Sequence, residues 1–165
     1  MPKLIKDEVI LDNEWKRIDA SVTDVNELPS GGHVLVPLEL WLAEKETLKA
    51  RLPNLGLSLC NTEDLSVLKD DIAQLPVIEI FFPAFMDGRG FSLGRLLRER
   101  YGFTGELRAG GQFIRDQLCY LRRCGFNSFA FEEDIDLESA KQSLHDFTDG
   151  YQPSVDQPQP LFMRR

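Results

Sequence analysis

The sequence predicts an α/β protein built on a mainly parallel five-stranded sheet with alternating helices and a small N-terminal β-hairpin. Short runs rich in β-branched and aromatic residues recur along the chain, and each is followed by apolar residues at helical spacing. The strand-to-strand interval is about 21–28 residues, which is typical of parallel strands joined by right-handed crossover helices. The alternative is a (β/α) barrel. Such a barrel would be only partial, because a standard barrel needs more strand–helix units than this chain shows.

The elements follow in a regular order. Residues 4–10 and 14–18 alternate between apolar and polar around Asp12-Asn13, which predicts the hairpin. The strands are expected at residues 33–36, 55–60, 77–82, 106–109 and 127–131. The helices are expected near residues 41–52, 65–75, 92–101, 114–121 and 137–147. Asn61-Thr62 is the expected N-cap of the second helix, and Gly102 the expected C-cap of the third.

The domain organisation is simple. Residues 1–148 are expected to form a single α/β domain with its N-terminal hairpin. Residues 149–165 contain Pro153, Pro158 and Pro160 without periodicity, and predict an extended arm. The apolar residues 161–163 of this arm would dock either on their own domain or on a partner.

Composition excludes several classes of protein. The hydrophobic fraction of 42% and charged fraction of 28% indicate a globular protein. No apolar run is long enough to cross a membrane, and residues 1–7 lack the core of a signal peptide, so a cytoplasmic location is expected. A net charge of -8 argues against a nucleic-acid partner. Three cysteines without a Cys-x-x-Cys pair, and only two histidines, predict neither a disulfide framework nor a metal site.

The charge is unevenly distributed. Residues 87–123 contain eight arginines and four acidic residues, a net charge of +4, so the remainder carries -12. No lysine occurs in this window. Because the planar guanidinium suits bidentate contacts with oxyanions, the asymmetry indicates a local anion site on an acidic protein.

Two glycine-containing stretches are the candidate ligand site. Asp87-Gly88-Arg89-Gly90 and Gly110-Gly111-Gln112 each follow a predicted strand and precede a predicted helix. Parallel sheets bind ligands at the carboxyl ends of their strands, where glycines let backbone N–H groups approach an anion. Arg89 would bind the anion, and Asp87 would either orient the arginine or accept a hydrogen bond from the substrate. The alternatives are an Asp–Arg pair that stiffens a turn and glycines that only make a close turn.

Arg95, Arg98, Arg115 and Arg122 are expected on exposed helix faces. They are either a solvated surface with acidic partners three or four residues away, or a docking patch for an acidic electron carrier. Cys119 has arginines four residues before it and three after it, which would favour a reactive thiol, although cysteines within helices are more often small buried apolar residues. Glu39, Asp64, Asp87 and Glu132 also follow strands, where such acids either cap helices or converge on a metal.

Four segments carry a resemblance to a known family: FPAFMDGRGFS, RLLRERYGFTGELRAGG, RDQLCYLRRCGF and YQPSVDQPQPLF. They resemble a proteobacterial family of unknown function, numbered 934 among such domains. The resemblance implies a link to sulfite reduction, because members are often described as probable oxidoreductases and are commonly encoded beside the sulfite reductase haemoprotein. It supplies no catalytic residue, and the sequence contains no recognisable cofactor motif.

Three functions follow as hypotheses. The first is an accessory protein of assimilatory sulfite reduction that binds a small anion or phosphate-bearing ligand at the DGRG loop and contacts the reductase or its acidic electron donor. The second is a small α/β oxidoreductase acting on a phosphate-bearing substrate or nucleotide through Asp87 and Arg89. The third is a purely structural interaction module.

Overall fold

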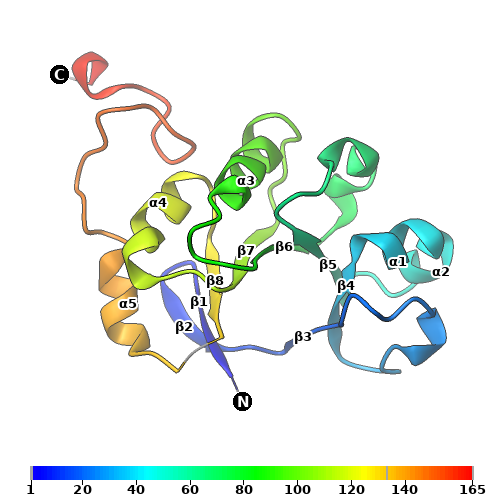
Figure 1. The fold of residues 1–165 in the computed structure, drawn as a ribbon. Coiled ribbons are helices and arrows are strands. Elements are labelled where there is room, and N and C mark those ends of the chain that lie inside the picture. Colours follow the sequence, from blue (N-terminus) through cyan, green and yellow to red (C-terminus); the bar gives the residue numbers. More distant parts are fainter. Residues whose placement is uncertain (1, 133, 165) are drawn as a thin grey trace.

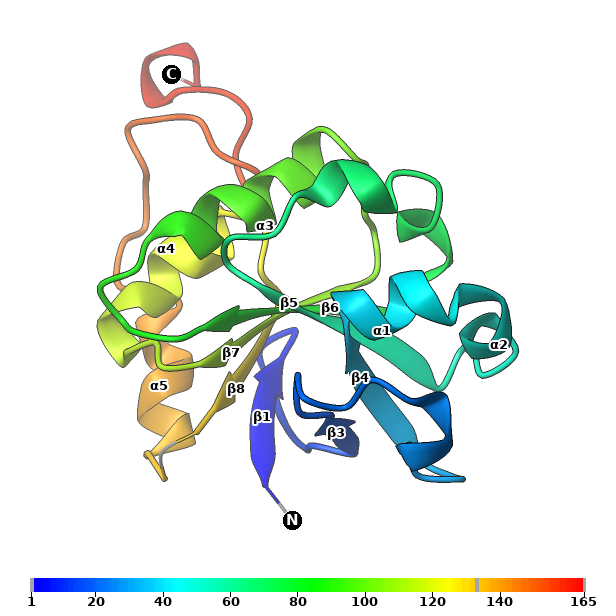
Figure 2. The same ribbon diagram turned by 45° about the vertical axis from the view of Figure 1, so that its right-hand side comes forward.

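The fold is a single curled sheet of eight strands with helices on its outer face (Figures 1 and 2). The computed structural model describes residues 2–132 and 134–164. The strands are β1 (Lys3–Lys6), β2 (Val9–Asp12), β3 (Trp15–Arg17), β4 (His33–Pro37), β5 (Leu55–Cys60), β6 (Val77–Phe82), β7 (Glu106–Gly111) and β8 (Ser128–Phe131). Their order in the sheet is β2-β1-β8-β7-β6-β5-β4-β3.

Strands β3 to β8 are parallel, each to its neighbour, whereas β1 runs antiparallel to both β8 and β2. The α/β class predicted from the sequence is therefore confirmed, and the sheet has the curled, half-barrel form that was the alternative. It has more strands than expected, because β3 adds a parallel strand beside β4 and the hairpin joins the other edge. The two edge strands, β2 and β3, are separated in the chain only by Asn13 and Glu14.

The helices surround the convex face of the sheet (Figure 2). They are α1 (Leu38–Ala43), α2 (Lys45–Lys49), α3 (Arg89–Glu99), α4 (Leu118–Arg123) and α5 (Leu137–Ser143). Short 3₁₀ helices connect them: η1 (Val25–Glu27), η2 (Leu65–Leu68), η3 (Ile72–Gln74), η4 (Arg115–Gln117) and η5 (Leu161–Met163). Among the described residues, no helix has the length and apolar character needed to cross a bilayer.

Alternation along the strands separates an apolar layer from a polar one. On β6, Ile80 and Phe82 face the helices, where α3 packs so closely that a Cβ on Gly90 would lie 2.5 Å from the Phe82 ring. Glu79, the residue before Ile80, faces the opposite, concave side and accepts a 2.8 Å hydrogen bond from the hydroxyl of Ser58 on β5. The concave face of the sheet therefore carries polar side chains that are buried.

A charged network crosses this concave face. The buried Arg108 of β7 donates hydrogen bonds to Glu106. Glu106 also forms a salt bridge with Lys6 of β1 at 2.8 Å. Burial disfavours the Glu106 carboxylate, but Arg108, Lys6 and Ser128 outweigh burial and lower its pKa. Arg108 also donates to the side chain of Asn13 at 3.1 Å, so the link between the two edge strands is tied to the centre of the sheet.

The predicted hairpin was wrong in its turn and in its second strand. The chain turns at Asp7 and Glu8, which both have positive φ, and β1 pairs with residues 9–12. Residues 15–17 lie at the opposite edge of the sheet, parallel to β4. Alternation of apolar and polar residues marks both strands, but it does not identify the partner of either strand.

Two helix predictions were also wrong. The expected helix over residues 65–75 is the pair of 3₁₀ helices η2 and η3, and Asp64 rather than Asn61 or Thr62 caps the first through the backbone N–H of Ser66. The helix expected over 41–52 is divided at Glu44 into α1 and α2. The spacing of apolar residues predicted longer helices, but tertiary structure can override local propensity.

The C-terminal residues 149–164 extend from the domain as a loop that returns on itself (Figure 1). Arg123, at the end of α4, donates to the carbonyl of Gln152 and pairs with Asp156 at 3.6 Å. Its own carbonyl accepts from the hydroxyl of Ser154 at 2.6 Å. Phe162 and Met163 stay exposed, so the apolar end of the arm does not pack onto the domain.

Candidate functional site

The Asp87-Gly88-Arg89-Gly90 stretch forms a closed ion pair at the start of α3. The Asp87 carboxylate accepts from the backbone N–H of Arg89 at 3.2 Å, from Nε at 2.8 Å, and from Nη2. The Arg89 guanidinium holds the pKa of Asp87 well below its usual range. Asp87 thus occupies the helix N-terminus that an external anion would need. An anion site at this turn remains a prediction that requires the pair to open.

Gly110 and Gly111, expected in a loop after a strand, have a different structural role. Gly110 and Gly111 belong to β7 itself and pair with Phe81 and Phe82, so they do not form a separate loop. A Cβ on Gly110 would lie 2.6 Å from the Glu79 carboxylate, and Gly111 has a φ of +88° that favours glycine. These close approaches to β6 explain the pair of glycines without a ligand, and the loop begins only at Gln112.

A cavity of about 410 Å³ opens at the carboxyl ends of β7 and β8. Residues of the β6–α3, β7–α4 and β8–α5 connections and of α5 line it: Phe85, Gly111, Gln112, Phe113, Ile114, Arg115, Phe131, Glu132, Ile135, Asp136 and Ser139. The structure therefore brings Gly111, Gln112 and Arg115 of the predicted residues to one cavity. Asp87, Gly88, Arg89, Gly90 and Gly110 do not line it.

The Gln117 side chain holds two walls of this cavity together. Its Nε2 donates to the carbonyl of Phe85 at 2.8 Å, and its Oε1 accepts from the backbone N–H of Ile114 at 3.1 Å. Arg115 reaches the third wall, where Nη1 donates to the hydroxyl of Ser139 on α5 at 2.8 Å. One amide and one guanidinium thus fix the three connections relative to one another.

The acidic groups of the cavity are already engaged. Glu132 pairs with Arg17 at 3.0 Å, and Arg17 stacks over the ring of Phe81 with its guanidinium carbon 3.9 Å from the centroid. Asp136 caps α5 by accepting from the backbone N–H groups of Glu138 and Ser139. The guanidinium of Arg115, whose only acidic neighbour within ion-pair range among the described residues is Asp116 at 4.0 Å, is the cationic group of the lining.

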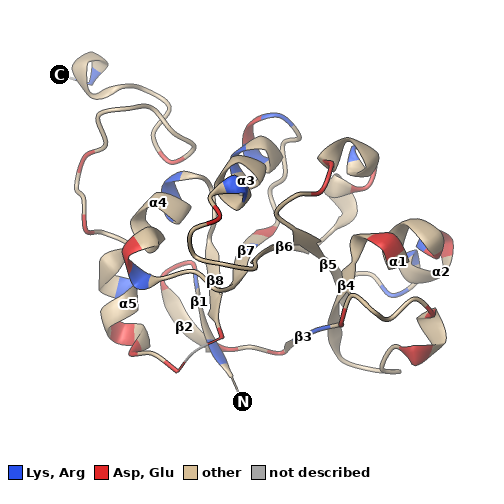
Figure 3. Ribbon diagram, in the orientation of Figure 1, with Lys and Arg blue, Asp and Glu red and all other residues tan. Residues whose placement is uncertain are grey.

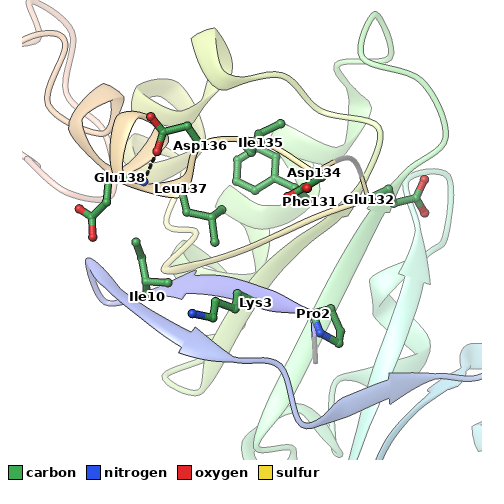
Figure 4. A pocket seen from close by; sticks show the side chains of 10 residues that line it. All are labelled: Pro2, Lys3, Ile10, Phe131, Glu132, Asp134, Ile135, Asp136, Leu137 and Glu138. Carbon is green, nitrogen blue, oxygen red and sulfur yellow. Dashed lines mark hydrogen bonds between the residues drawn. The ribbon is translucent and has the colours of Figure 1, made fainter.

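A second hollow of about 800 Å³ adjoins this cavity (Figure 4). The two share Phe131, Glu132, Ile135 and Asp136. The acidic side chains of the β8–α5 connection lie along one side of the second hollow, and Lys3 and Ile10 of the N-terminal strands lie along the other (Figure 4). Arg115 is the cation that lines the first cavity, whereas Lys3 is the cation that lines the second hollow.

The four arginines expected on exposed helix faces are not equivalent. Figure 3 shows basic positions on α3 and α4. Arg95 is exposed and pairs with Glu99 at 2.9 Å, whereas Arg98 is half-buried and donates inward, so the expectation of an exposed Arg98 was wrong. Arg115 is exposed, and Arg122 is half-buried between acidic residues of the hairpin and the arm.

Cys119 of α4 is buried, with 4% of its surface exposed. A thiol buried to this extent is poorly reachable by a dissolved oxidant or substrate, which disfavours the reactive role. Ile114, expected on the buried face with Leu118 and Leu121, is instead 44% exposed. It precedes η4 rather than belonging to a helix, and it faces the cavity.

A carboxyl that the sequence did not single out lies at the same edge of the sheet. Glu63 follows β5, and its Oε2 is buried without a hydrogen-bond partner. Burial and the neighbouring charge of Glu39 raise the pKa of Glu63 to about 7. Its position after a strand could have marked Glu63 as a candidate site residue. Asp64 beside it has the same position and also fits an N-cap. Among the described residues, no three acidic, His or Cys side chains are grouped as a metal site would require.

The fold and cavity define an α/β protein with a ligand-sized cavity at the carboxyl edge of a curled parallel sheet. Comparison with known proteins identifies its family. Residues 56–162 match the family described as bacterial protein of unknown function (DUF934), and the chain belongs to this family. No curated protein and no solved structure matches the chain.

Proposed function

We propose that this protein is a cytoplasmic accessory protein of assimilatory sulfite reduction that binds an anionic ligand in the cavity at the ends of β7 and β8. The proposal of an anion site is supported by one observation: Arg115, Gln112 and Ser139 surround one cavity. This cavity lies at the sheet edge where parallel α/β proteins bind ligands. The link to sulfite reduction rests on the family resemblance alone.

The cavity supports the anion site better than the DGRG turn does. Arg89 is paired with Asp87 through two side-chain hydrogen bonds, so an incoming anion would have to displace a carboxylate. Arg115 donates to a neutral hydroxyl, and its acidic neighbour Asp116 is 4.0 Å away. Less electrostatic attraction is lost when an anion binds there.

Docking on the reductase or on its acidic electron donor would use exposed arginines. Arg95 and Arg115 fit this role because they are exposed, whereas Arg98 is committed to internal hydrogen bonds. Charge complementarity of this kind accelerates encounter and weakens as the salt concentration rises. Co-purification with the haemoprotein that is lost for Arg95→Glu, and is unchanged for Val67→Ala on the exposed surface of η2, is the expected result.

Thermal unfolding against sulfite, sulfate, phosphate, nucleotides, nicotinamides and flavins tests the anion site. A ligand that binds only the folded state raises the melting temperature in a saturable way. We expect such a shift to be lost for Arg115→Gln and kept for Arg100→Gln, an exposed arginine at the end of α3. A shift lost only for Arg89→Gln would return the site to the DGRG turn, and no shift with any compound would contradict an anion site altogether.

The second candidate function is a small α/β enzyme, and Glu63 favours it. A carboxyl with a pKa of about 7 is suited to donate and accept protons at neutral pH. If the protein is an oxidoreductase acting on a phosphate-bearing substrate or nucleotide, Glu63→Gln should abolish turnover while the variant still folds. Turnover that survives this substitution would remove the observation in favour of an enzyme. Failure of every binding, docking and turnover test would leave the structural interaction module.

A further inference from the structure

The size of the cavity bears on the class of ligand. A water molecule occupies about 30 Å³ in the liquid, and an inorganic oxyanion occupies only a few times that volume. The cavity measures about 410 Å³, which lies within the range of about 300–1,000 Å³ found for sites that hold organic ligands. An inorganic anion at Arg115 would leave most of the cavity unfilled.

Five of the eleven residues that line the cavity are aromatic or aliphatic. Phe113 and Phe131 pack against each other with ring centroids 4.6 Å apart, and Ile135 adds an aliphatic surface. At the rim, Phe85 is 49% exposed and Ile114 is 44% exposed. Large apolar side chains that remain exposed around a cavity mark a surface that gains free energy when an apolar group covers it.

Five of the eleven lining residues are polar, and the two carboxylates among them are engaged elsewhere. Arg115, Ser139 and Gln112 supply donors, whereas Glu132 is held by Arg17 and Asp136 by the backbone of α5. Gln117 fixes the apolar rim, because it bonds the backbones of both Phe85 and Ile114. The lining thus combines one cationic region with an apolar enclosure that is already assembled.

We infer that the ligand of this cavity is an amphiphilic anion, namely a phosphate ester or carboxylate carried on an apolar ring-sized group. The inference rests on the proposed anion site and names the class of its ligand. The anionic group binds Arg115, with Gln112 and Ser139 as further donors. The apolar body lies between Phe85 and Ile114 at the rim and Phe131 and Ile135 inside.

Calorimetric titration with matched probes tests this inference. Phenyl phosphate carries both parts of the expected ligand, inorganic phosphate carries only the anion, and benzyl alcohol carries only the ring. We expect phenyl phosphate to bind at least about tenfold more tightly than either partial probe. Equal affinity for phenyl phosphate and inorganic phosphate would overturn the inference and leave the proposed anion site standing, whereas no binding of either anion would contradict both.

Variants separate the two halves of the site. Arg115→Gln should reduce phenyl phosphate binding to the level of benzyl alcohol, with Arg100→Gln as the matched control. Phe85→Ala should reduce phenyl phosphate binding about tenfold and leave the weak binding of inorganic phosphate unchanged, with the exposed Leu96→Ala of α3 as its control. Because Phe85 and Ile114 are both about half exposed, Ile114→Ala provides a second test of the rim that spares the core. Unchanged phenyl phosphate binding in both rim variants would overturn the inference.

Discussion

Replacing Glu63 with glutamine should change how the stability of this protein depends on pH. The pKa of Glu63 is raised from 4.5 to about 7 in the folded protein, by burial first and then by the charge of Glu39. Between these two values the folded state binds a proton that the unfolded state has released. Stability therefore falls as the pH rises from about 4.5 to about 7, and the penalty is complete above that range.

The magnitude follows from the two pKa values. A tenfold change in acidity corresponds to about 1.4 kcal/mol, so the difference between 4.5 and about 7 sets an upper bound of roughly 3 kcal/mol. The side chain is only partly buried, and solvent screening reduces this bound to about 1–2 kcal/mol. Glutamine removes the charge while keeping the shape, so Glu63→Gln should be about 1–2 kcal/mol more stable than the natural protein at pH 8 and nearly equal to it at pH 5.

Urea unfolding at pH 5 and pH 8 measures this difference. The exposed Glu27→Gln serves as the matched control, and its difference from the natural protein should be the same at both pH values. Removing the neighbouring charge in Glu39→Gln should reproduce part of the gain at pH 8. If Glu63→Gln and the natural protein differ by the same amount at both pH values, the carboxyl is not held protonated and the reasoning is refuted.

Three further predictions concern the helices that cover the sheet. Arg98→Ala should cost about 2–4 kcal/mol in urea unfolding, because this side chain donates to four acceptors at 2.6–3.2 Å. Arg95→Ala on the same helix should stay within about 0.5 kcal/mol, and equal effects of the two would contradict the distinction. Gly94→Ala should cost about 1–3 kcal/mol, since its Cβ would lie 2.3 Å from the ring of Phe126; a neutral effect would show that the ring moves aside. Arg123→Ala should release the arm, so limited proteolysis within residues 150–164 should accelerate while the urea midpoint of the domain changes little; equal cleavage rates would mean that Arg123 does not hold the arm.

The strands were the most predictable part of the fold. The expected strand over residues 77–82 has the bounds of β6, because a run of β-branched and aromatic residues specifies a buried strand locally. The partners of β1 and β3 could not be predicted in the same way. Ile5 pairs with Phe129 and Trp15 with His33, and such distant contacts leave no local pattern in either strand.

Only part of the lining of the candidate cavity could be predicted from the sequence. The rule that ligands bind at the carboxyl ends of parallel strands led to Gly111 and Gln112, which line the cavity. It also led to Asp87 and Arg89, whose mutual pairing depends on side-chain geometry that spacing alone does not determine. Ser139 could not be found from the sequence, since it enters the cavity from a helix whose placement depends on the curl of the sheet.

The two-residue link between the edge strands has a consequence for the order in which the chain folds. Strands β1, β2 and β3 precede the other strands in the chain, yet β1 pairs with β8 near the other end of the domain. Contacts between residues so far apart in the chain form slowly, because a long loop must close before they gain any free energy. Since only Asn13 and Glu14 separate β2 from β3, we expect the N-terminal segment to join both edges of the sheet in one late step, after β4 to β8 have assembled.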